Sequence, residues 1–158
     1  MVMTPAVEAL EAAGAKYRFL EVPGSVSGED YCKAVNELVG KDVSDRVYKT
    51  LVMQGNSGTV YVFAIPALSK LAQRQVARAL GEKELQMLKP IDLKKLTGYV
   101  HGGCSPLGMK HQYRTILDEV AGEQETIMIN GGGGGYLVEL SLEEFGKALP
   151  YELMPLKK

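Results

Sequence analysis

A lysine occupies an otherwise apolar face of a predicted strand. Residues 47–54 are rich in β-branched and apolar residues, which predicts a strand whose side chains alternate between two faces. One face then carries Lys49 together with Val47, Leu51 and Met53. A lysine resists burial unless its ammonium group reaches a partner or a cavity. Lys49 is therefore a candidate for binding or catalysis; the alternative is a lysine near a sheet edge that reaches water and discourages aggregation.

A glycine-containing loop is the second candidate. The segment from His101 to Gly108 reads His-Gly-Gly-Cys-Ser-Pro-Leu-Gly. Glycines let a backbone approach a ligand closely and direct N–H groups at it, and Pro106 stiffens the loop. Such a loop can bind a carboxyl-like group or an oxygen on which negative charge develops. The alternative is a plain turn.

Cysteine chemistry and a metal centre are both weakly supported. Cys104 follows His101 by three residues, as a nucleophile and its base could, but no third residue that would orient the histidine is evident. We therefore do not expect Cys104 to act as a nucleophile. His101, His111 and Cys104 match none of the known zinc spacings, so we expect no metal and no other cofactor.

A run of five glycines, Gly131 to Gly135, separates two predicted strands. It lacks the Gly-Lys-Ser/Thr ending that places a lysine and a hydroxyl group on phosphate and magnesium, so it is not a phosphate-binding loop of that type. We expect a hairpin turn; a flap over a ligand is the alternative.

The composition predicts one ordinary domain over residues 1–158. The chain has 158 residues, 46% of them hydrophobic, and two distant cysteines, which favour a reducing compartment over a disulfide framework. The first residues lack the basic and apolar regions of a secretion signal, and no apolar run approaches the roughly 20 residues that span a bilayer. We expect a cytoplasmic protein without a membrane partner.

The net charge of −1 provides no overall attraction for nucleic acid, so an RNA partner would require a local basic surface. Two clusters are candidates, although each also fits a solvated face. The first comprises Lys70, Arg74, Arg78 and Lys83, and the second comprises Lys94, Lys95, Lys110, His111 and Arg114.

Helices and strands interleave along the chain, and several strands are joined by hairpins. Helices are expected from Pro5, from the Ser27/Asp30 cap, over 72–80, from Asp92 and from the capping box of Ser141 and Glu144. Strands are expected over 16–22, 47–54, 59–65, 114–118, 126–130 and 136–140. This order indicates an α/β (α+β) fold with a mixed, largely antiparallel sheet and helices packed around it.

Several segments together resemble the YbaK family of aminoacyl-tRNA deacylases. They are M-T-P-A-V-x-x-L at Met3–Leu10, V-Y-K-T-L at Val47–Leu51, V-A-R-A-L-G at Val76–Gly81, T-G-Y-V-H-G-G-C-S-P-L-G at Thr97–Gly108 and T-I-M-I-N-G-G at Thr126–Gly132. The likeness covers nearly the whole chain in the same order, and the pairing of V-Y-K-T-L with G-G-x-S-P-L-G is its most specific part.

The resemblance implies a barrel-like mixed sheet flanked by helices and a free-standing enzyme that removes cysteine from mischarged Cys-tRNA(Pro), with Cys-tRNA(Cys) as a further expected substrate. It also implies action alongside prolyl-tRNA synthetase. The family's key lysine matches Lys49, which would anchor the terminal adenosine or its phosphate. The residues implied to face the substrate are Thr50, Gly102, Gly103, Cys104, Ser105, Pro106, Leu107, Gly108, Asn130, Gly131 and Gly132.

This sequence also departs from the family pattern. Some members carry Ser where Asn130 stands and Asp where Leu137 stands, and aromatic residues that members place near Val22 and Ser27 are missing here. Because these positions border the family's amino-acid pocket, the amino acid that is removed stays open. The alternatives are deacylation of Ala-tRNA(Pro), a non-catalytic tRNA- or nucleotide-binding module, and a hydrolase of small aminoacyl esters.

Overall fold

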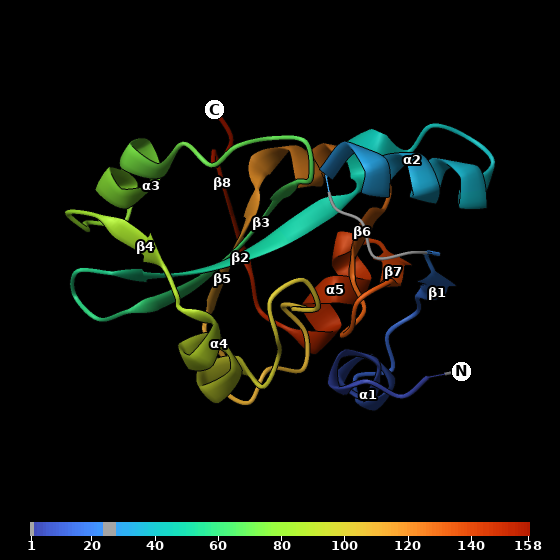
Figure 1. The fold of residues 1–158 in the computed structure, drawn as a ribbon, viewed down its shortest axis with the longest axis horizontal. Helices are drawn as coiled ribbons and strands as arrows, with labels where there is room; N and C mark the ends of the chain where they lie inside the picture. The colour runs from blue at the N-terminus through green and yellow to red at the C-terminus, as the bar shows by residue number, and fades with distance from the viewer. Residues whose placement is uncertain (1, 24–27) are drawn as a thin grey trace.

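The computed structural model describes residues 2–23 and 28–158, which form helices and strands in the order shown in Figure 1. The α-helices are α1 (Pro5–Ala12), α2 (Gly28–Val39), α3 (Gln73–Ala79), α4 (Pro90–Thr97) and α5 (Leu142–Ala148), with 3₁₀ turns η1 (Ser44–Arg46) and η2 (Glu119–Glu123). The strands are β1 (Arg18–Glu21), β2 (Tyr48–Gly55), β3 (Val60–Pro66), β4 (Leu85–Met87), β5 (Arg114–Asp118), β6 (Ile127–Asn130), β7 (Tyr136–Leu140) and β8 (Glu152–Met154).

These strands form two sheets, which with the surrounding helices give the mixed α/β fold expected from the sequence. The order is β1-β7-β6 in one sheet, which is antiparallel, and β4-β2-β3-β5-β8 in the other. In the larger sheet β5 runs parallel to β3 and to β8, so the prediction of a mixed, largely antiparallel arrangement is confirmed. A bridge between Val47 and Met128 joins the start of β2 to β6 and thereby connects the two sheets.

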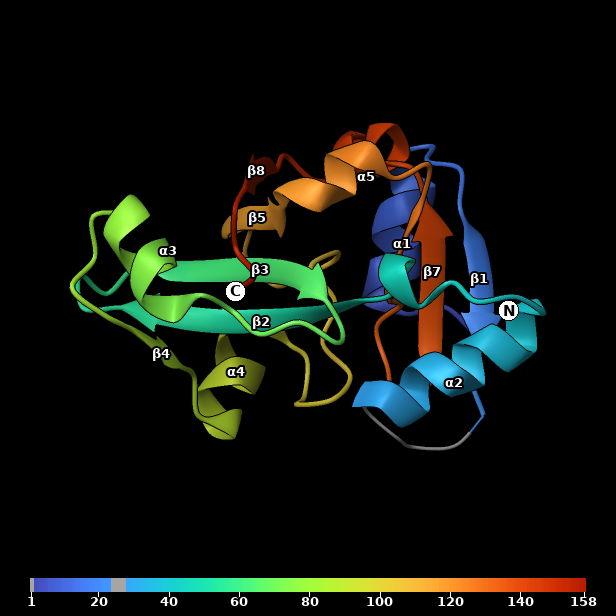
Figure 2. The ribbon, with the colours of Figure 1, turned by 90° about the horizontal axis from the view of Figure 1, so that it is seen from above.

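The larger sheet has a helix on each face, which Figure 2 shows with α3 and α4 on opposite sides of β2 and β3. Met53 packs with Val76 of α3, whereas Val52 packs with Leu93 of α4. Adjacent residues of β2 therefore face opposite helices, as the predicted alternation requires.

The local cap residues fit the expected helices, with two corrections. The hydroxyl oxygens of Thr4 and Ser141 accept hydrogen bonds from the first turns of α1 and α5. Glu144, however, does not complete a capping box, because its carboxylate accepts a hydrogen bond from the N–H of Lys16 at 2.7 Å. Asp92 does not cap α4: the helix begins at Pro90, and Lys89 holds the N-cap position.

Two short strands were not predicted from the sequence. β4 and β8 have three residues each, and their burial patterns show none of the alternation by which a strand is found. Both form by pairing with a longer neighbour, β4 with β2 and β8 with β5. The expected cap at Ser27 lies outside the described residues.

The first turn of α1 supports the loop from His101 to Gly108. Leu107 is buried in the same apolar cluster as Ala6 and Leu10 of α1, and its carbonyl oxygen accepts a hydrogen bond from the Tyr99 hydroxyl at 2.6 Å. Gly108 has a φ of +72°, and a Cβ there would lie 2.3 Å from the carbonyl oxygen of Pro5. Only glycine permits this approach of loop to helix.

We predict that Gly108→Ala destabilises the protein more than Gly58→Ala does. Both glycines have positive φ, but Gly58 has no neighbour within 4 Å of an added Cβ. Gly58→Ala should cost about 1–2 kcal/mol from backbone strain, and Gly108→Ala about 1–3 kcal/mol more from overpacking. Thermal unfolding measures the difference, at about 2–4 °C per kcal/mol. Equal melting temperatures would contradict the packing of this loop on α1.

Candidate functional site

One edge of β2 is shared by two different partners. β6 meets it at Val47, and β4 pairs with it from Met53 to Gly55, with the N–H of Leu88 donating to the carbonyl of Val52 at 3.3 Å. Between these contacts no strand in residues 2–23 and 28–158 pairs with this edge. Because successive residues of a strand turn their backbone groups to opposite edges, the N–H and C=O of Thr50 point the same way as those of Val52, into this gap.

A cavity of about 470 Å³ lies at the gap, within the range usual for ligand sites. It reaches both faces of the larger sheet, because it surrounds an open strand edge. Its walls are contributed by α2, β2, β4, α4, the segment after α4 and the β6–β7 turn. The lining residues are Tyr31, Tyr48, Lys49, Thr50, Leu51, Val52, Ala67, Met87, Leu88, Leu93, His101, Gly102, Cys104, Asn130, Gly134, Gly135 and Leu137.

Lys49 is half-buried and lines this cavity between two apolar clusters. Val47 belongs to the cluster under α2, and Met53 belongs to the cluster under α3. Within the described part of the chain, no carboxylate lies within ion-pair distance of Lys49, and no Asp or Glu lines the cavity. The site therefore offers an ammonium group to an anionic ligand inside a largely apolar wall.

Two residues of the predicted glycine loop reach the cavity. Gly102 and Cys104 line it, and neither backbone N–H has an acceptor among residues 2–23 and 28–158. Gly103 is buried, and its N–H donates to the carbonyl of Val100 at 3.0 Å. The loop can therefore direct the N–H groups of residues 102 and 104, but not that of Gly103, at an oxygen on a ligand.

The remainder of this loop does not line the cavity. Ser105 is fully buried, and its Oγ accepts a hydrogen bond from the N–H of Leu107 at 3.1 Å. Pro106 and Leu107 are also buried, and Gly108 faces Pro5. These four residues hold the loop in place rather than form the cavity wall.

The glycine turn after β6 is organised by Asn130. Its Oδ1 accepts hydrogen bonds from the N–H groups of Gly132 and Gly133, at 2.7 and 3.1 Å, and its Nδ2 donates to the carbonyl of Gly133 at 3.1 Å. Asn130 lines the cavity, but of the glycines it is Gly134 and Gly135 that do so, not the predicted Gly131 and Gly132.

Gly131 and Gly132 face helix α1 instead. The hydroxyl of Thr4 donates to the carbonyl of Gly131 at 2.5 Å, and a Cβ on Gly132 would lie 2.7 Å from the Thr4 side chain. The same turn touches the first glycine loop, since a Cβ on Gly103 would lie 3.2–3.3 Å from the backbone of residues 133–134. The two glycine segments therefore support each other without side chains between them.

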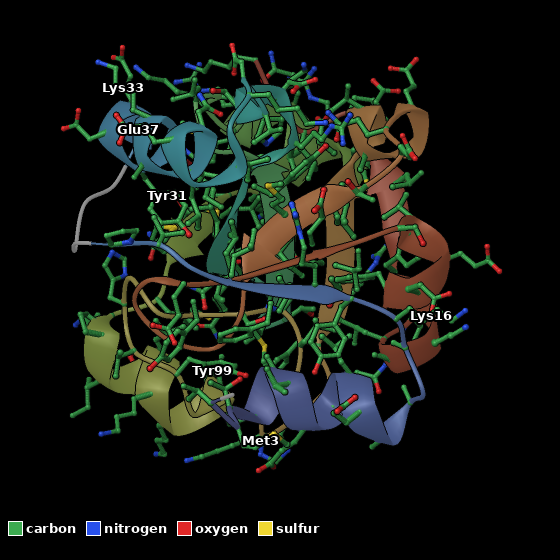
Figure 3. All side chains as sticks on the ribbon, turned by 90° about the vertical axis from the view of Figure 1, so that its right-hand side faces the viewer. Met3, Lys16, Tyr31, Lys33, Glu37 and Tyr99 are labelled. Atoms are coloured by element: carbon green, nitrogen blue, oxygen red, sulfur yellow. The ribbon has the colours of Figure 1, made fainter. Side chains whose placement is uncertain are left out.

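Sequence reasoning missed several apolar and aromatic wall residues. Tyr31 lies on the side of α2 that faces the rest of the molecule, opposite to Lys33 (Figure 3), and burial raises the pKa of its hydroxyl to about 12. Leu93 is buried and reads from the sequence as an ordinary core residue, whereas Leu137, which the family pattern places at the border of the pocket, is buried and lines the cavity. No local pattern distinguishes a core leucine from one that borders a cavity, whereas Tyr31 could have been suspected as a polar-tipped residue on a helix face.

The geometry gives no support to a cysteine nucleophile. The Cys104 thiol contacts the carbonyl of Ser105 at 4.0 Å, and no hydrogen bond joins it to His101 in the described part of the chain. Burial raises the pKa of the Cys104 thiol to about 12, so it remains protonated at neutral pH. In the same residues no three His, Cys, Asp or Glu side chains gather as metal ligands, and no helix is long and apolar enough to cross a bilayer.

Comparison with known proteins identifies the family. The model of the aminoacyl-tRNA editing domain matches residues 28–148. The chain belongs to the aminoacyl-tRNA editing domain family. A member from Enterococcus faecalis (strain ATCC 700802 / V583), provisionally named Cys-tRNA(Pro)/Cys-tRNA(Cys) deacylase EbsC, is 40% identical over 117 residues, which cover 73% of this chain and 71% of that protein. The family expected from the sequence motifs is thus confirmed.

Solved structures share the fold of this protein over nearly the whole chain. A protein described provisionally as a trans-editing enzyme for prolyl tRNA synthetase superposes with a TM-score of 0.83 at 24% identity, covering 100% of this chain and 99% of that one. The hypothetical protein APE2540 superposes with a TM-score of 0.82 at 21% identity, covering 98% and 99%. The arrangement of the two sheets and their helices is therefore one already seen in solved structures.

We predict that Cys104 reacts slowly with a thiol-alkylating reagent in the folded protein. In a Cys32→Ser variant, where Cys104 is the remaining thiol, alkylation at pH 8 should be about three orders of magnitude slower than for a free thiol, because so little thiolate is present. Unfolding in urea should restore the ordinary rate. Mass spectrometry follows the reaction, and rapid labelling of the folded protein would revive a covalent role.

Proposed function

We propose that this protein removes cysteine from mischarged tRNA, chiefly Cys-tRNA(Pro), by cleaving the ester between the amino acid and the terminal adenosine. The observation that carries the proposal is the half-buried Lys49, which has no carboxylate partner among the described residues, in a cavity that also presents the N–H groups of Gly102 and Cys104. The editing-domain family and the name of the E. faecalis relative support the same substrate.

The need for such an enzyme follows from the limits of recognition. A pocket that binds one small amino acid rejects a similar one by only about 1–3 kcal/mol, so cysteine and alanine enter a proline pocket. A second site must then remove the errors. We expect residues 1–158 to act as one editing domain in the cytoplasm, on the tRNA products of prolyl-tRNA synthetase.

The proposed mechanism uses positioning and electrostatics. Lys49 binds the terminal adenosine or its phosphate and fixes the ester beside the open edge of β2. The N–H groups of Gly102 and Cys104 then stabilise the carbonyl oxygen as it becomes negative. The apolar wall formed by Leu51, Leu88 and Leu93 keeps water away from these charges and strengthens the interactions.

The attacking group is water or the substrate's own thiol. In the second case the substrate sulfur bonds to its own carbonyl carbon, the ester bond to the ribose oxygen breaks, and the thiol proton ends on that oxygen. Water then opens the resulting thiolactone. This route needs no enzyme nucleophile, in keeping with a protonated Cys104, and it cannot act on alanine.

We predict that Lys49→Ala folds but loses deacylation of Cys-tRNA(Pro) by about 100-fold or more, the scale of one preorganised electrostatic contact. Single-turnover ester loss from Cys-tRNA(Pro), Ala-tRNA(Pro) and Cys-tRNA(Cys) measures this, with circular dichroism as a check of folding. The matched control is Cys104→Ser, which should retain most activity. A folded Lys49→Ala protein with near-normal rates would disprove the role of Lys49, and strong activity on Ala-tRNA(Pro) would require water as the nucleophile.

The open strand edge generates a second prediction. Thr50→Pro removes an N–H that points into the gap and should lower activity at least about 10-fold with little loss of stability, since no sheet hydrogen bond depends on it. Leu51→Pro removes an N–H directed at β3 and should unfold the protein. Thr50→Val is the control for the hydroxyl group and should remain active. An active Thr50→Pro enzyme would show that this edge does not contact the substrate.

A further inference from the structure

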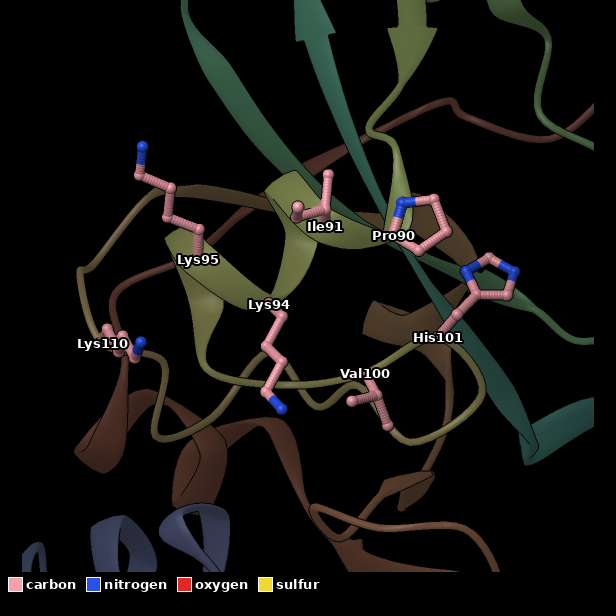
Figure 4. A pocket seen from close by; sticks show the side chains of 7 residues that line it. All are labelled: Pro90, Ile91, Lys94, Lys95, Val100, His101 and Lys110. Carbon is pink, nitrogen blue, oxygen red and sulfur yellow. The ribbon is translucent and has the colours of Figure 1, made fainter.

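A second hollow lies beside the cavity and shares His101 with it. This hollow has a volume of about 500 Å³ and is formed by α4, the segment that follows α4, and Lys110 (Figure 4). We call it the α4 groove. The residues that define it are Ile91, Lys94, Lys95, Val100, His101 and Lys110.

Three lysines give the α4 groove a local positive charge. Lys94, Lys95 and Lys110 form no ion pair with any residue in the described ranges, although the whole chain has a net charge of −1. Lys94 and Lys95 lie in the last turn of α4, where the carbonyl end of the helix attracts cations. Lys110 comes from a separate segment, so this attraction does not account for it.

The position of Lys110 is fixed by its neighbours. Its N–H donates to the carbonyl of Thr97 at 3.0 Å, and its Cγ lies 3.2 Å from where a Cβ on Gly98 would stand. The side chain therefore packs over the end of α4, and three lysines from two segments line the groove.

The groove also exposes apolar side chains between its cations. Ile91 is 77% exposed and Val100 is 54% exposed, although Leu93 of the same helix is buried. Figure 4 shows Lys94 extending from α4 toward Val100. A surface that combines cations with an apolar floor suits a ligand with phosphates on one side and bases or sugars on the other.

We propose that the α4 groove binds the single-stranded RNA that leads into the cavity, that is, the nucleotides immediately before the esterified terminal adenosine. The proposal rests on the proposed function: His101 lines both hollows, so a strand whose end occupies the cavity can continue past this residue into the groove. The lysines would neutralise phosphates, and Ile91 and Val100 would contact bases or riboses.

This placement revises the second basic cluster of the sequence analysis. Arg114 is not part of the groove, because its Nε and Nη2 donate to the carboxylate of Glu152 at 2.6 and 2.8 Å. The ring of His111 lies against that of Tyr113, with the centroids 6.3 Å apart. Only the three lysines of the cluster line the groove.

The test compares two triple variants with the same change of charge. One replaces Lys94, Lys95 and Lys110 with Gln; the control makes the same change at Lys41, Lys157 and Lys158, which are exposed, form no ion pair in the described structure and belong to neither basic cluster. Affinity for tRNA(Pro) that carries no amino acid is measured at several salt concentrations. Hydrolysis is measured on Cys-tRNA(Pro) and on the small ester cysteinyl-adenosine, which is too short to reach the groove.

We expect the groove variant to bind tRNA at least about 10-fold more weakly and to lower the salt slope by about 2, while the control changes neither. Its KM for Cys-tRNA(Pro) should rise with kcat unchanged, and cysteinyl-adenosine should be cleaved normally. Lys49→Ala, by contrast, should fail on both substrates.

Equal tRNA affinity and salt slope in the two variants would overturn the groove proposal while leaving Lys49-dependent deacylation intact. Unchanged tRNA affinity with altered sedimentation or altered binding of prolyl-tRNA synthetase would assign the groove to a protein partner and also overturn it. If the wild-type protein cleaved neither substrate, the proposed function would fail, and the affinity measurement alone would decide whether the groove binds RNA.

Discussion

The site depends on one constraint of backbone geometry, which is that a strand can pair only where a neighbour reaches its edge. β2 is long enough to meet β6 at Val47 and β4 from Met53, and no described strand pairs with the edge between them. An unpaired stretch of buried edge would be costly, because its N–H and C=O groups would lose hydrogen bonds to water. The cavity at Thr50 resolves this by leaving these groups accessible to solvent or to a ligand, beside the lysine that precedes them.

The same arrangement explains how a lysine is kept in an apolar environment. Lys49 belongs to a face whose other residues pack under α2 and α3, and it lies where those two clusters separate. Its ammonium group can thus reach the cavity while its aliphatic stem contacts the apolar walls. With no carboxylate among the described residues that line it, the site favours a negative group on the ligand, whether a phosphate or an oxygen that becomes charged during ester cleavage.

Helix α1 secures both loops that border the cavity, although it does not line the cavity itself. Its cap residue Thr4 donates to the carbonyl of Gly131, and the carbonyl of Pro5 contacts Gly108. The two loops also touch each other through Gly103 and the backbone of residues 133–134. Backbone-to-backbone contact of this kind requires glycine. The glycines therefore hold the loops in position as well as letting a ligand approach the backbone.

The sequence by itself determined the local elements, the family and the residue types of the site. Alternation in β2 placed Lys49 on an apolar face, and helix caps and glycines located most helices and turns, because these signals act over a few residues. Tertiary structure alone decided which residues meet: β4 and β8 form only by pairing, and the Glu144 carboxylate accepts from the distant N–H of Lys16. It also selected Gly134 and Gly135 over Gly131 and Gly132 as cavity residues. The physical reason is that a cavity is a property of several chain segments in contact, and no short segment encodes its partners' positions.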